Sequence, residues 1–173
     1  MKPSDTRREV LNQFINFFWT ILCFAPVIYF WVLSGLHLPF YLFLAIAVVI
    51  GMMPKKLLNL LSLSANRKFY EKIGVKHIRK FVQNGDFVAA MTGARINQVI
   101  KGHSQIKAYL KTIAMYERYH WICFIFFLLT TIYCFFSCYI VLGVLITVAN
   151  LLYNVSSILL QQYNRVRIMK LVN

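Results

Sequence analysis

Charged side chains are scarce in this chain, and acidic ones are the scarcest. Lysine, arginine, aspartate and glutamate make up 14% of its 173 residues, and only five are Asp or Glu, whereas soluble domains carry about 25% charged residues. Hydrophobic residues reach 60%, and the mean hydropathy is +0.62. A soluble domain of this size could not bury that much apolar surface. The composition therefore excludes an ordinary soluble domain and predicts an integral membrane protein.

Cysteine is also rare, and common catalytic and metal-binding motifs are missing. The four cysteines fall in apolar runs, and their spacing matches neither a zinc site nor a secreted disulfide framework. We interpret all four as small apolar core residues. The sequence has no G-x-S-x-G, no Walker loop and no G-x-G-x-x-G, so the usual hydrolase and nucleotide-binding signatures are absent.

Long apolar runs are what the sequence does contain. They predict transmembrane helices over residues 14–34, 39–53, 120–136 and 139–160. The first run is too long for a signal peptide, and no small-x-small cleavage site follows it. Ser137 and Cys138 leave almost no loop before the last run, which predicts a tight helical hairpin. The expected fold is all-α: one domain over residues 1–173, a polytopic membrane bundle of about four transmembrane helices.

The basic residues lie on one side of this arrangement. Thirteen of the nineteen Lys and Arg residues fall within residues 54–119, three precede the first span and three follow the last. The positive-inside rule then places both termini and residues 54–119 in the cytoplasm of a protein of the cell membrane. This placement accounts for the net charge of +14, so we expect membrane lipids, and no nucleic acid, as partners.

Part of the basic segment has helical periodicity. An apolar stripe runs from Ile96 to His120 at steps of three and four residues. Lys101, Lys107 and Lys111 lie mostly off that stripe. The pattern predicts a basic amphipathic helix that lies on the membrane surface and leads into the third span.

Amide side chains form a second stripe near the C-terminus. Helical spacing places five polar residues on one face: Asn150, Asn154, Ser157, Gln161 and Asn164. An amide in hydrocarbon needs a hydrogen-bond partner, so this face should point into the bundle or a wet cavity. Two interpretations stay open, hydrogen bonding between helices for the first three and a site at the cytoplasmic mouth for Gln161, Asn164 and Arg165.

The start of the third span adds candidate catalytic groups. In the expected hairpin, "MYERYHW" at residues 115–121 lies beside the end of the fourth span. Glu117 and His120 share a helix face, and Glu117 either orients His120 or pairs with Arg165. Together with the amides they form a plausible acid–base site, although His120 as a simple interfacial residue remains the alternative. A di-iron bundle needs two Glu-x-x-His motifs, and this chain has one, so we expect no metal.

Three stretches together resemble a known family. They are "NRKFYEKIGVKHIRKFV" (66–82), "YERYHW" (116–121) and "NLLYNVSSILLQQYNRVR" (150–167). In this order they resemble the glycosyl-diaponeurosporenoate acyltransferase family of staphyloxanthin biosynthesis, whose members are small membrane proteins. Gln162 stands where that family has arginine. The resemblance implies functional roles for Tyr70, Glu71, Gly74, Lys76, Glu117, His120, Trp121, Asn150, Gln161, Tyr163, Asn164, Arg165 and Arg167.

The resemblance implies transfer of a fatty acyl group from acyl-CoA or a similar thioester to a hydroxyl of a lipid-linked acceptor, either with or without a sugar. His120 and Glu117 would be catalytic, as base and orienting group, and no cofactor would be tightly bound. Asn164 or Gln161 would stabilise the oxyanion, and Arg165 and Arg167 would hold phosphates. The expected substrate-binding set is Asn150, Asn154, Gln161, Tyr163, Asn164, Arg165, Arg167, Glu71 and Lys76.

Two other functions stay open from the sequence. The first is a non-enzymatic assembly or transport subunit in which the amide stripe serves only helix packing. The second is a membrane methyltransferase acting on lipid-like thiols, which is also small and helical, but its Arg-His-Pro type of signature is not seen here. Under the first alternative, Glu117 and His120 would be replaceable.

Overall fold

The structure is a computed structural model that describes residues 3–82, 85–92 and 103–170. All regular elements in this described part are helical, which confirms the all-α fold class. They are α1 (Pro3–Ser34), α2 (Leu38–Gly51), α3 (Lys55–Leu60), α4 (Arg67–Lys72), α5 (Val75–Ile78), the 3₁₀ turn η1 (Arg79–Phe81), α6 (Asp86–Thr92), α7 (His103–Phe136), α8 (Ile140–Asn150), the π-helical turn η2 (Leu151–Val155) and α9 (Ser156–Met169).

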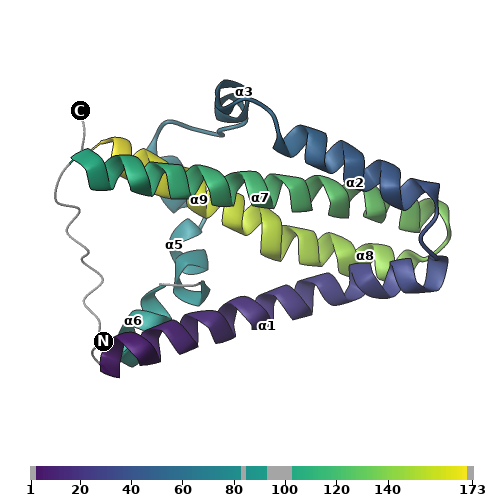
Figure 1. The fold of residues 1–173 in the computed structure, drawn as a ribbon, viewed down its shortest axis with the longest axis horizontal. Helices are drawn as coiled ribbons and strands as arrows, with labels where there is room; N and C mark the ends of the chain where they lie inside the picture. Colours follow the sequence, from purple (N-terminus) through teal and green to yellow (C-terminus); the bar gives the residue numbers. More distant parts are fainter. Residues whose placement is uncertain (1–2, 83–84, 93–102, 171–173) are drawn as a thin grey trace.

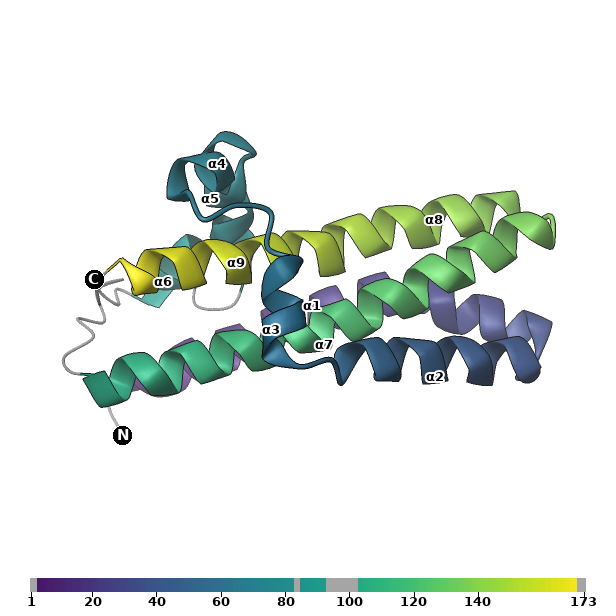
Figure 2. The same ribbon diagram turned by 90° about the horizontal axis from the view of Figure 1, so that it is seen from above.

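The apolar helices form a bundle along the long axis of the molecule. α1, α2, α7 and the run α8–η2–α9 lie along this axis, with both termini at one end and the tight turns at the other (Figures 1 and 2). Within the described residues, three helices are long and apolar enough to cross a membrane, over Thr6–Ser34, Gln105–Phe136 and Ile140–Met169. α2 has 14 residues, about 21 Å, which is short against a hydrocarbon core of about 30 Å. The chain is thus a helical membrane bundle with a shorter apolar helix packed against α7.

α7 differs from the expected pair of a surface helix and a separate span. It runs without a break from His103 to Phe136, because the sequence between these residues contains neither proline nor glycine to bend it. The beginning of the predicted surface helix, residues 96–102, lies outside the described residues. The predicted hairpin is confirmed, since α8 starts at Ile140, and the turn uses Cys138 at a φ of +62°.

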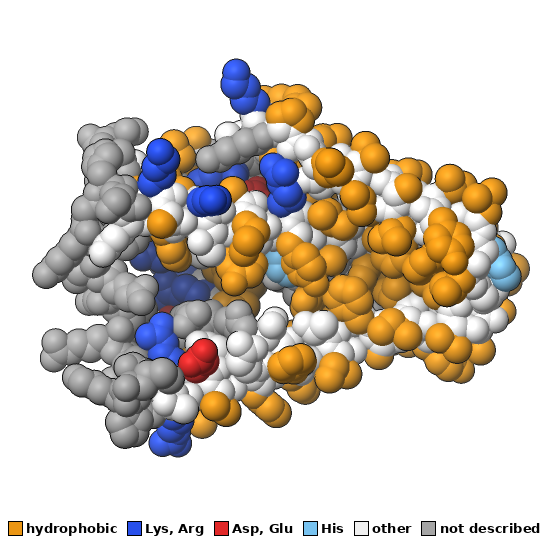
Figure 3. Space-filling view, viewed as in Figure 1, with side chains coloured by type: hydrophobic (Ala, Val, Ile, Leu, Met, Phe, Trp, Pro, Cys, Tyr) orange, Lys and Arg blue, Asp and Glu red, His pale blue; other side chains and the backbone are white. Residues whose placement is uncertain are grey.

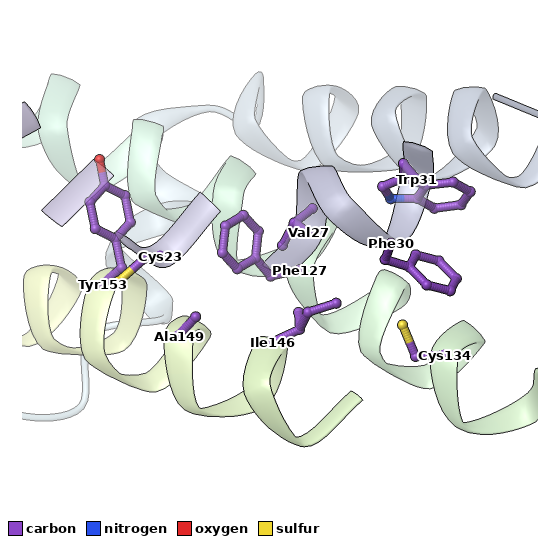
Figure 4. Close-up of a cluster of buried hydrophobic side chains, with 9 residues drawn as sticks. All are labelled: Cys23, Val27, Phe30, Trp31, Phe127, Cys134, Ile146, Ala149 and Tyr153. Carbon is purple, nitrogen blue, oxygen red and sulfur yellow. The ribbon is translucent and has the colours of Figure 1, made fainter. Parts of the chain in front are cut away.

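An aromatic core joins α1, α7 and α8–η2 (Figure 4). The Phe24 ring makes edge contacts with Phe127 at 4.9 Å and Tyr153 at 5.5 Å between centroids. Nearer the turn end, Trp31 Nε1 donates a hydrogen bond to Thr130 Oγ1 at 3.2 Å. These contacts fix the order of helices that lie far apart in the sequence.

The cysteines follow the core interpretation with one exception. Cys23, Cys123 and Cys134 are buried free thiols, as expected. Cys138 is exposed, so the core interpretation is wrong for this residue. The reason is that Cys138 occupies the turn between α7 and α8, where its positive φ directs the chain back on itself.

On the face shown in Figure 3, the described Lys and Arg side chains lie in the half of the bundle that holds the termini, and the other half is largely apolar. The short helices α4–α6 fold back at the basic end. Trp19 Nε1 on α1 donates to the carbonyl oxygen of Phe81 at 3.1 Å, and α6 packs against α1. The face is hollowed between α1 and the α7–α9 pair at this end (Figure 3).

Candidate functional site

The π-helical turn η2 changes which side chains face the bundle. A π turn takes one more residue than an α turn, so the residues after Leu151–Val155 are rotated relative to a continuous α-helix. The inward face therefore continues from Asn154 through Ile158 and Gln162, which are buried. The predicted stripe is wrong beyond the turn, since three of its members are only half-buried, Ser157, Gln161 and Asn164.

The two asparagines before and within the turn form a hydrogen-bonded chain that ends at His120. Asn150 Nδ2 donates to the carbonyl oxygen of Phe124 at 3.1 Å. Asn154 Nδ2 donates to Asn150 Oδ1 at 2.8 Å. Asn154 Oδ1 then lies 3.3 Å from His120 Nδ1. Both asparagines are buried, so their amides have their partners within the bundle, as amides in hydrocarbon require.

The hydrogen bonds from Phe124 to His120 run in one direction, from acceptor to donor at each step. This direction assigns the tautomer of His120. A backbone carbonyl can only accept a hydrogen bond, so Asn150 must point its NH₂ group at Phe124 and its oxygen at Asn154. Asn154 in turn presents its oxygen to His120. The hydrogen-bond network therefore places the proton of neutral His120 on Nδ1 and leaves the lone pair on Nε2. A histidine held in this way is suited to act as a base through Nε2.

Aromatic rings surround the imidazole. His120 is half-buried. The centroid of its ring lies 5.1 Å from the ring centroid of Tyr119 and 5.2 Å from that of Tyr153. The Tyr153 hydroxyl lies 3.1 Å from Thr20 Oγ1 on α1. The two rings pack against the imidazole and restrict its orientation.

Glu117 belongs to a different cluster. Its buried carboxylate pairs with Arg165, with Nη1 to Oε2 at 2.5 Å. Gln162 Nε2 donates to Oε1 at 3.1 Å. Of the two roles open to Glu117, the structure therefore shows the pair with Arg165. The expected contact that would orient His120 is replaced by the one from Asn154, because Gln162 and Arg165 face Glu117 after the π-helical turn.

Gln162 is the residue that the sequence reasoning missed. Besides Glu117, its Nε2 contacts the carbonyl oxygen of Leu61 at 3.2 Å. Its Oε1 accepts hydrogen bonds from Leu63 N at 3.2 Å and from the Tyr70 hydroxyl at 3.1 Å. The available signal was its position inside the third family-like stretch, where it replaces an arginine. Through these hydrogen bonds, Gln162 holds the loop before α4 against α9.

Glu71 is the centre of a third cluster at the basic end. Its Oε1 pairs with Arg67 Nε at 2.6 Å and accepts a hydrogen bond from the Tyr163 hydroxyl at 3.1 Å. Its Oε2 lies 3.1 Å from Lys76 Nζ. Gly74, at a φ of +89°, makes the turn that returns Lys76 to Glu71, a conformation that suits glycine. Hydrogen bonds from Arg67 and then Lys76 lower the pKa of Glu71 to about 2.

This lowered pKa predicts an acid-dependent loosening of α4 and α5. A carboxylate with a depressed pKa in the folded state stabilises the fold fully above its unfolded value of about 4.3. That contribution is lost as the pH falls towards a pKa of about 2. We expect the unfolding midpoint of the wild type to exceed that of Glu71→Gln at pH 6, with the difference shrinking between pH 4.5 and 2. Thermal unfolding in detergent across this range checks it, and a constant difference would contradict it.

The remaining predicted site residues do not meet at one point. Gln161 and Asn164 lie half-buried on α9 and make no side-chain hydrogen bond within the described part of the chain. Arg167 is exposed, and its guanidinium carbon lies 5.5 Å from the centroid of the Tyr163 ring. Arg165 is engaged by Glu117 and by Ser62 Oγ at 3.1 Å, a placement that does not suit phosphate binding.

Comparison with protein families gives a match over most of the chain. The family model described as glycosyl-4,4'-diaponeurosporenoate acyltransferase matches residues 54–173. The matched region contains all three clusters, around His120, Glu117 and Glu71. Comparisons with curated proteins and with solved structures gave no match.

Proposed function

The chain belongs to the glycosyl-4,4'-diaponeurosporenoate acyltransferase family, and we propose that it moves a fatty acyl group from a thioester to a hydroxyl of a lipid-linked acceptor. In this proposal the acceptor carries a sugar, and the reaction takes place at the cytoplasmic face of the cell membrane. The acyl thioester, such as acyl-CoA, is a co-substrate and not a bound cofactor.

The observation that carries the proposal is the directed chain from Phe124 through Asn150 and Asn154 to His120. Acyl transfer to a hydroxyl needs a base that faces the substrate with an unprotonated nitrogen. The hydrogen-bonded chain from Phe124 supports this role for His120 Nε2, with Asn154 as the positioning residue. Asn154 thus takes the place that a carboxylate holds in a Ser-His-Asp triad.

The proposed reaction proceeds in two proton transfers. His120 Nε2 takes the proton of the acceptor hydroxyl while its oxygen attacks the thioester carbonyl carbon, and a C–O bond forms. The tetrahedral intermediate collapses, the C–S bond breaks, and the thiolate leaves. The proton on Nε2 then passes to the sulfur, so the products are an ester and a thiol. Asn154 Oδ1 accepts the Nδ1–H hydrogen bond throughout, which stabilises the imidazolium.

The distribution of charge supports the proposed orientation in the membrane and the proposed binding of the thioester donor. On the face shown in Figure 3, basic side chains lie in the half of the bundle that holds both termini, which favours a cytoplasmic location for that end. Arg167 and the lysines of α4 are exposed there and would bind the phosphates of the thioester donor.

A reconstituted assay tests the proposed reaction. Purified protein in liposomes would receive a long-chain acyl-CoA and a glycolipid with a free sugar hydroxyl. The proposal predicts ester product and released thiol in equal amounts, both dependent on protein. Thiol release without ester would indicate hydrolysis, and no product with a panel of glycolipids would contradict the proposal.

Asn154 provides a test of the positioning role. We expect Asn154→Leu to lower kcat by about 10–100-fold, by analogy with the loss of a group that orients a metal-binding histidine, with little change in KM. Asn154→Asp keeps an oxygen acceptor for Nδ1–H and should retain more activity than the leucine variant. The measurement is steady-state kinetics on variants with matched unfolding midpoints. Equal activity of Asn154→Leu and wild type would contradict the role.

A further inference from the structure

The side chains of α4 divide into three faces. Tyr70 is buried and packs against α9. Lys68 and Lys72 stand two positions before and two positions after Tyr70, on the opposite face of the helix, and both are exposed. Phe69 and the C-cap residue Ile73 lie four residues apart along one flank, and both are also exposed. α4 therefore combines an outward basic face with an exposed apolar flank.

α3 has the same pattern. Its buried residue is Leu58, and Lys56, two positions earlier, is exposed. Leu57 and the C-cap residue Leu61 are exposed along the corresponding flank, and Leu60, on the outward face, is 78% exposed. Lysines beside exposed apolar residues on a short helix are typical of a segment that lies in the interface between lipid and water.

Contacts with α9 give the depth of both helices in the membrane. The run α8–η2–α9 begins at Ile140, next to the tight turn, and about 20 residues of helix cross a hydrocarbon core of about 30 Å. Gln162 and Tyr163 come just after this length. Tyr163 packs against Tyr70 of α4, and Gln162 Nε2 donates to the carbonyl oxygen of Leu61 at the end of α3. α3 and α4 therefore lie at the depth of the lipid headgroups.

Both helices project sideways from the bundle. α3 stands out from its side in Figure 1, and α4 does so together with α5 in Figure 2. A segment that extends sideways at headgroup depth lies along the bilayer surface, whereas a segment that continues the long axis reaches into the aqueous phase. This position favours a lipid surface over a soluble acidic protein as the partner of α3 and α4.

The outward lysines of α4 are available for an external anion. Next to them, Glu71 engages Arg67 and Lys76 in ion pairs. Lys68 and Lys72 take part in none of the ion pairs within the described residues. An anionic lipid surface attracts Lys and Arg side chains that lie close to it, so the charge of this face complements anionic headgroups.

We propose that α3 and α4 form a platform that docks on anionic phospholipids of the surrounding bilayer. The apolar residues of the platform insert below the lipid phosphates, and its lysines bind these phosphates: Leu57, Leu60, Leu61, Phe69 and Ile73, with Lys56, Lys68 and Lys72. The lysines of α4 hold lipid phosphates when no thioester donor occupies them. The inference needs no acyl transfer, so it holds or fails independently of the proposed function.

Thermal unfolding in nanodiscs tests the platform. The full chain would be placed in phosphatidylcholine alone and in a mixture of phosphatidylcholine with anionic phosphatidylglycerol. A ligand of the folded state raises the unfolding midpoint, so the anionic lipid should raise that of the wild type, and high salt should remove most of this gain. Lys68→Gln with Lys72→Gln should lower the gain by about 4–8 °C, given the usual contribution of a lysine near an anionic surface.

The matched control is Lys107→Gln with Lys111→Gln. These lysines are also exposed and four residues apart. Counted from Phe136, α7 leaves the hydrocarbon after about 20 residues, so both lysines lie beyond the headgroups. This variant should keep most of the wild-type gain.

Three results of the unfolding experiment would overturn the inference. The first is an unfolding midpoint of the wild type that is the same in both lipid compositions, which would leave a soluble acidic protein as the partner of this surface. The second is an equal loss of the gain in the two double variants. The third is an equal gain from inorganic phosphate in neutral nanodiscs, which would indicate a site for a free anion.

Photolabelling tests the contact itself, without relying on stability. Phosphatidylglycerol and phosphatidylcholine would each carry a diazirine at the headgroup end of an acyl chain and would be added separately to the nanodiscs. The inference predicts severalfold more labelling of residues 57–61 and 68–73 by the phosphatidylglycerol probe in the wild type, and near-equal labelling by the two probes in Lys68→Gln with Lys72→Gln. Equal labelling by both probes in the wild type would show bulk lipid contact only and overturn the inference.

Discussion

Replacing His120 with alanine is expected to lower kcat for acyl transfer by roughly 10²–10⁴-fold, the contribution of a positioned general base. The alanine variant keeps Asn150 and Phe124 in place, since their hydrogen bond does not involve the imidazole. Substrate binding should change little, so KM should stay near the wild-type value. Steady-state kinetics in liposomes, with thiol release and ester formation followed together, gives both constants.

His77→Ala is the matched control for this loss. His77 is an exposed histidine on α5 and takes no part in the hydrogen bonds that lead to His120. Its alanine variant should have wild-type kinetics. Full activity in a folded His120→Ala protein would exclude the imidazole as the base and with it the mechanism proposed above.

Breaking the Glu117–Arg165 pair is expected to cost about 3–5 kcal/mol of stability, as removal of one partner of a buried ion pair usually does. Glu117→Ala leaves the Arg165 guanidinium in a site where it is only 12% exposed. It also takes a hydrogen-bond acceptor from Gln162. For a chain of this size the unfolding midpoint should fall by about 6–20 °C, measured by thermal unfolding in detergent.

The double variant Glu117→Leu with Arg165→Met distinguishes a structural role of this ion pair from a catalytic one. It removes both charges at once, which is often neutral for stability, and Gln162 keeps its contacts with Leu61 and Leu63. We expect an unfolding midpoint close to that of the wild type. A double variant that is stable but inactive would place Glu117 or Arg165 in the reaction and contradict their structural role.

The bundle was predictable because its signals are local. Each apolar run is long enough to be recognised by itself, and the short spacing at Ser137 and Cys138 leaves room only for a turn. This hairpin brings the start of α7's apolar half beside α9, so the neighbourhood of His120 and the C-terminal amides also follows from the sequence. The chain-wide distribution of Lys and Arg identifies one end of the bundle without any structural information.

The partners of individual side chains were less predictable, mainly because of one turn. The pattern from Asn150 to Asn164 was read with α-helical spacing throughout, and Leu151–Val155 forms a π-helical turn. The extra residue moves Gln162 and Arg165 onto the inward face in place of Gln161 and Asn164. Nothing in the local sequence signals such a turn, since π turns are rare and depend on packing.

Contacts between distant segments were the other missing part. Gln162 meets Leu61 and Leu63 about a hundred positions earlier in the chain, and Tyr163 meets Glu71. The family-like stretches indicated that these regions matter, but a motif does not state which side chains touch. Asn154 was included as one of several amides, and only its geometry singles it out as the partner of His120.

Comparative lipid mass spectrometry would test the central claim most directly, namely acyl transfer with His120 as the base. Wild type and His120→Ala would be expressed at matched membrane levels in cells supplied with a range of glycosylated lipid acceptors. The account predicts a lipid heavier by one fatty acyl group with the wild type, and its loss or near loss with the variant. Identical lipid profiles from two folded proteins would contradict it and would favour a non-enzymatic subunit whose amides serve helix packing.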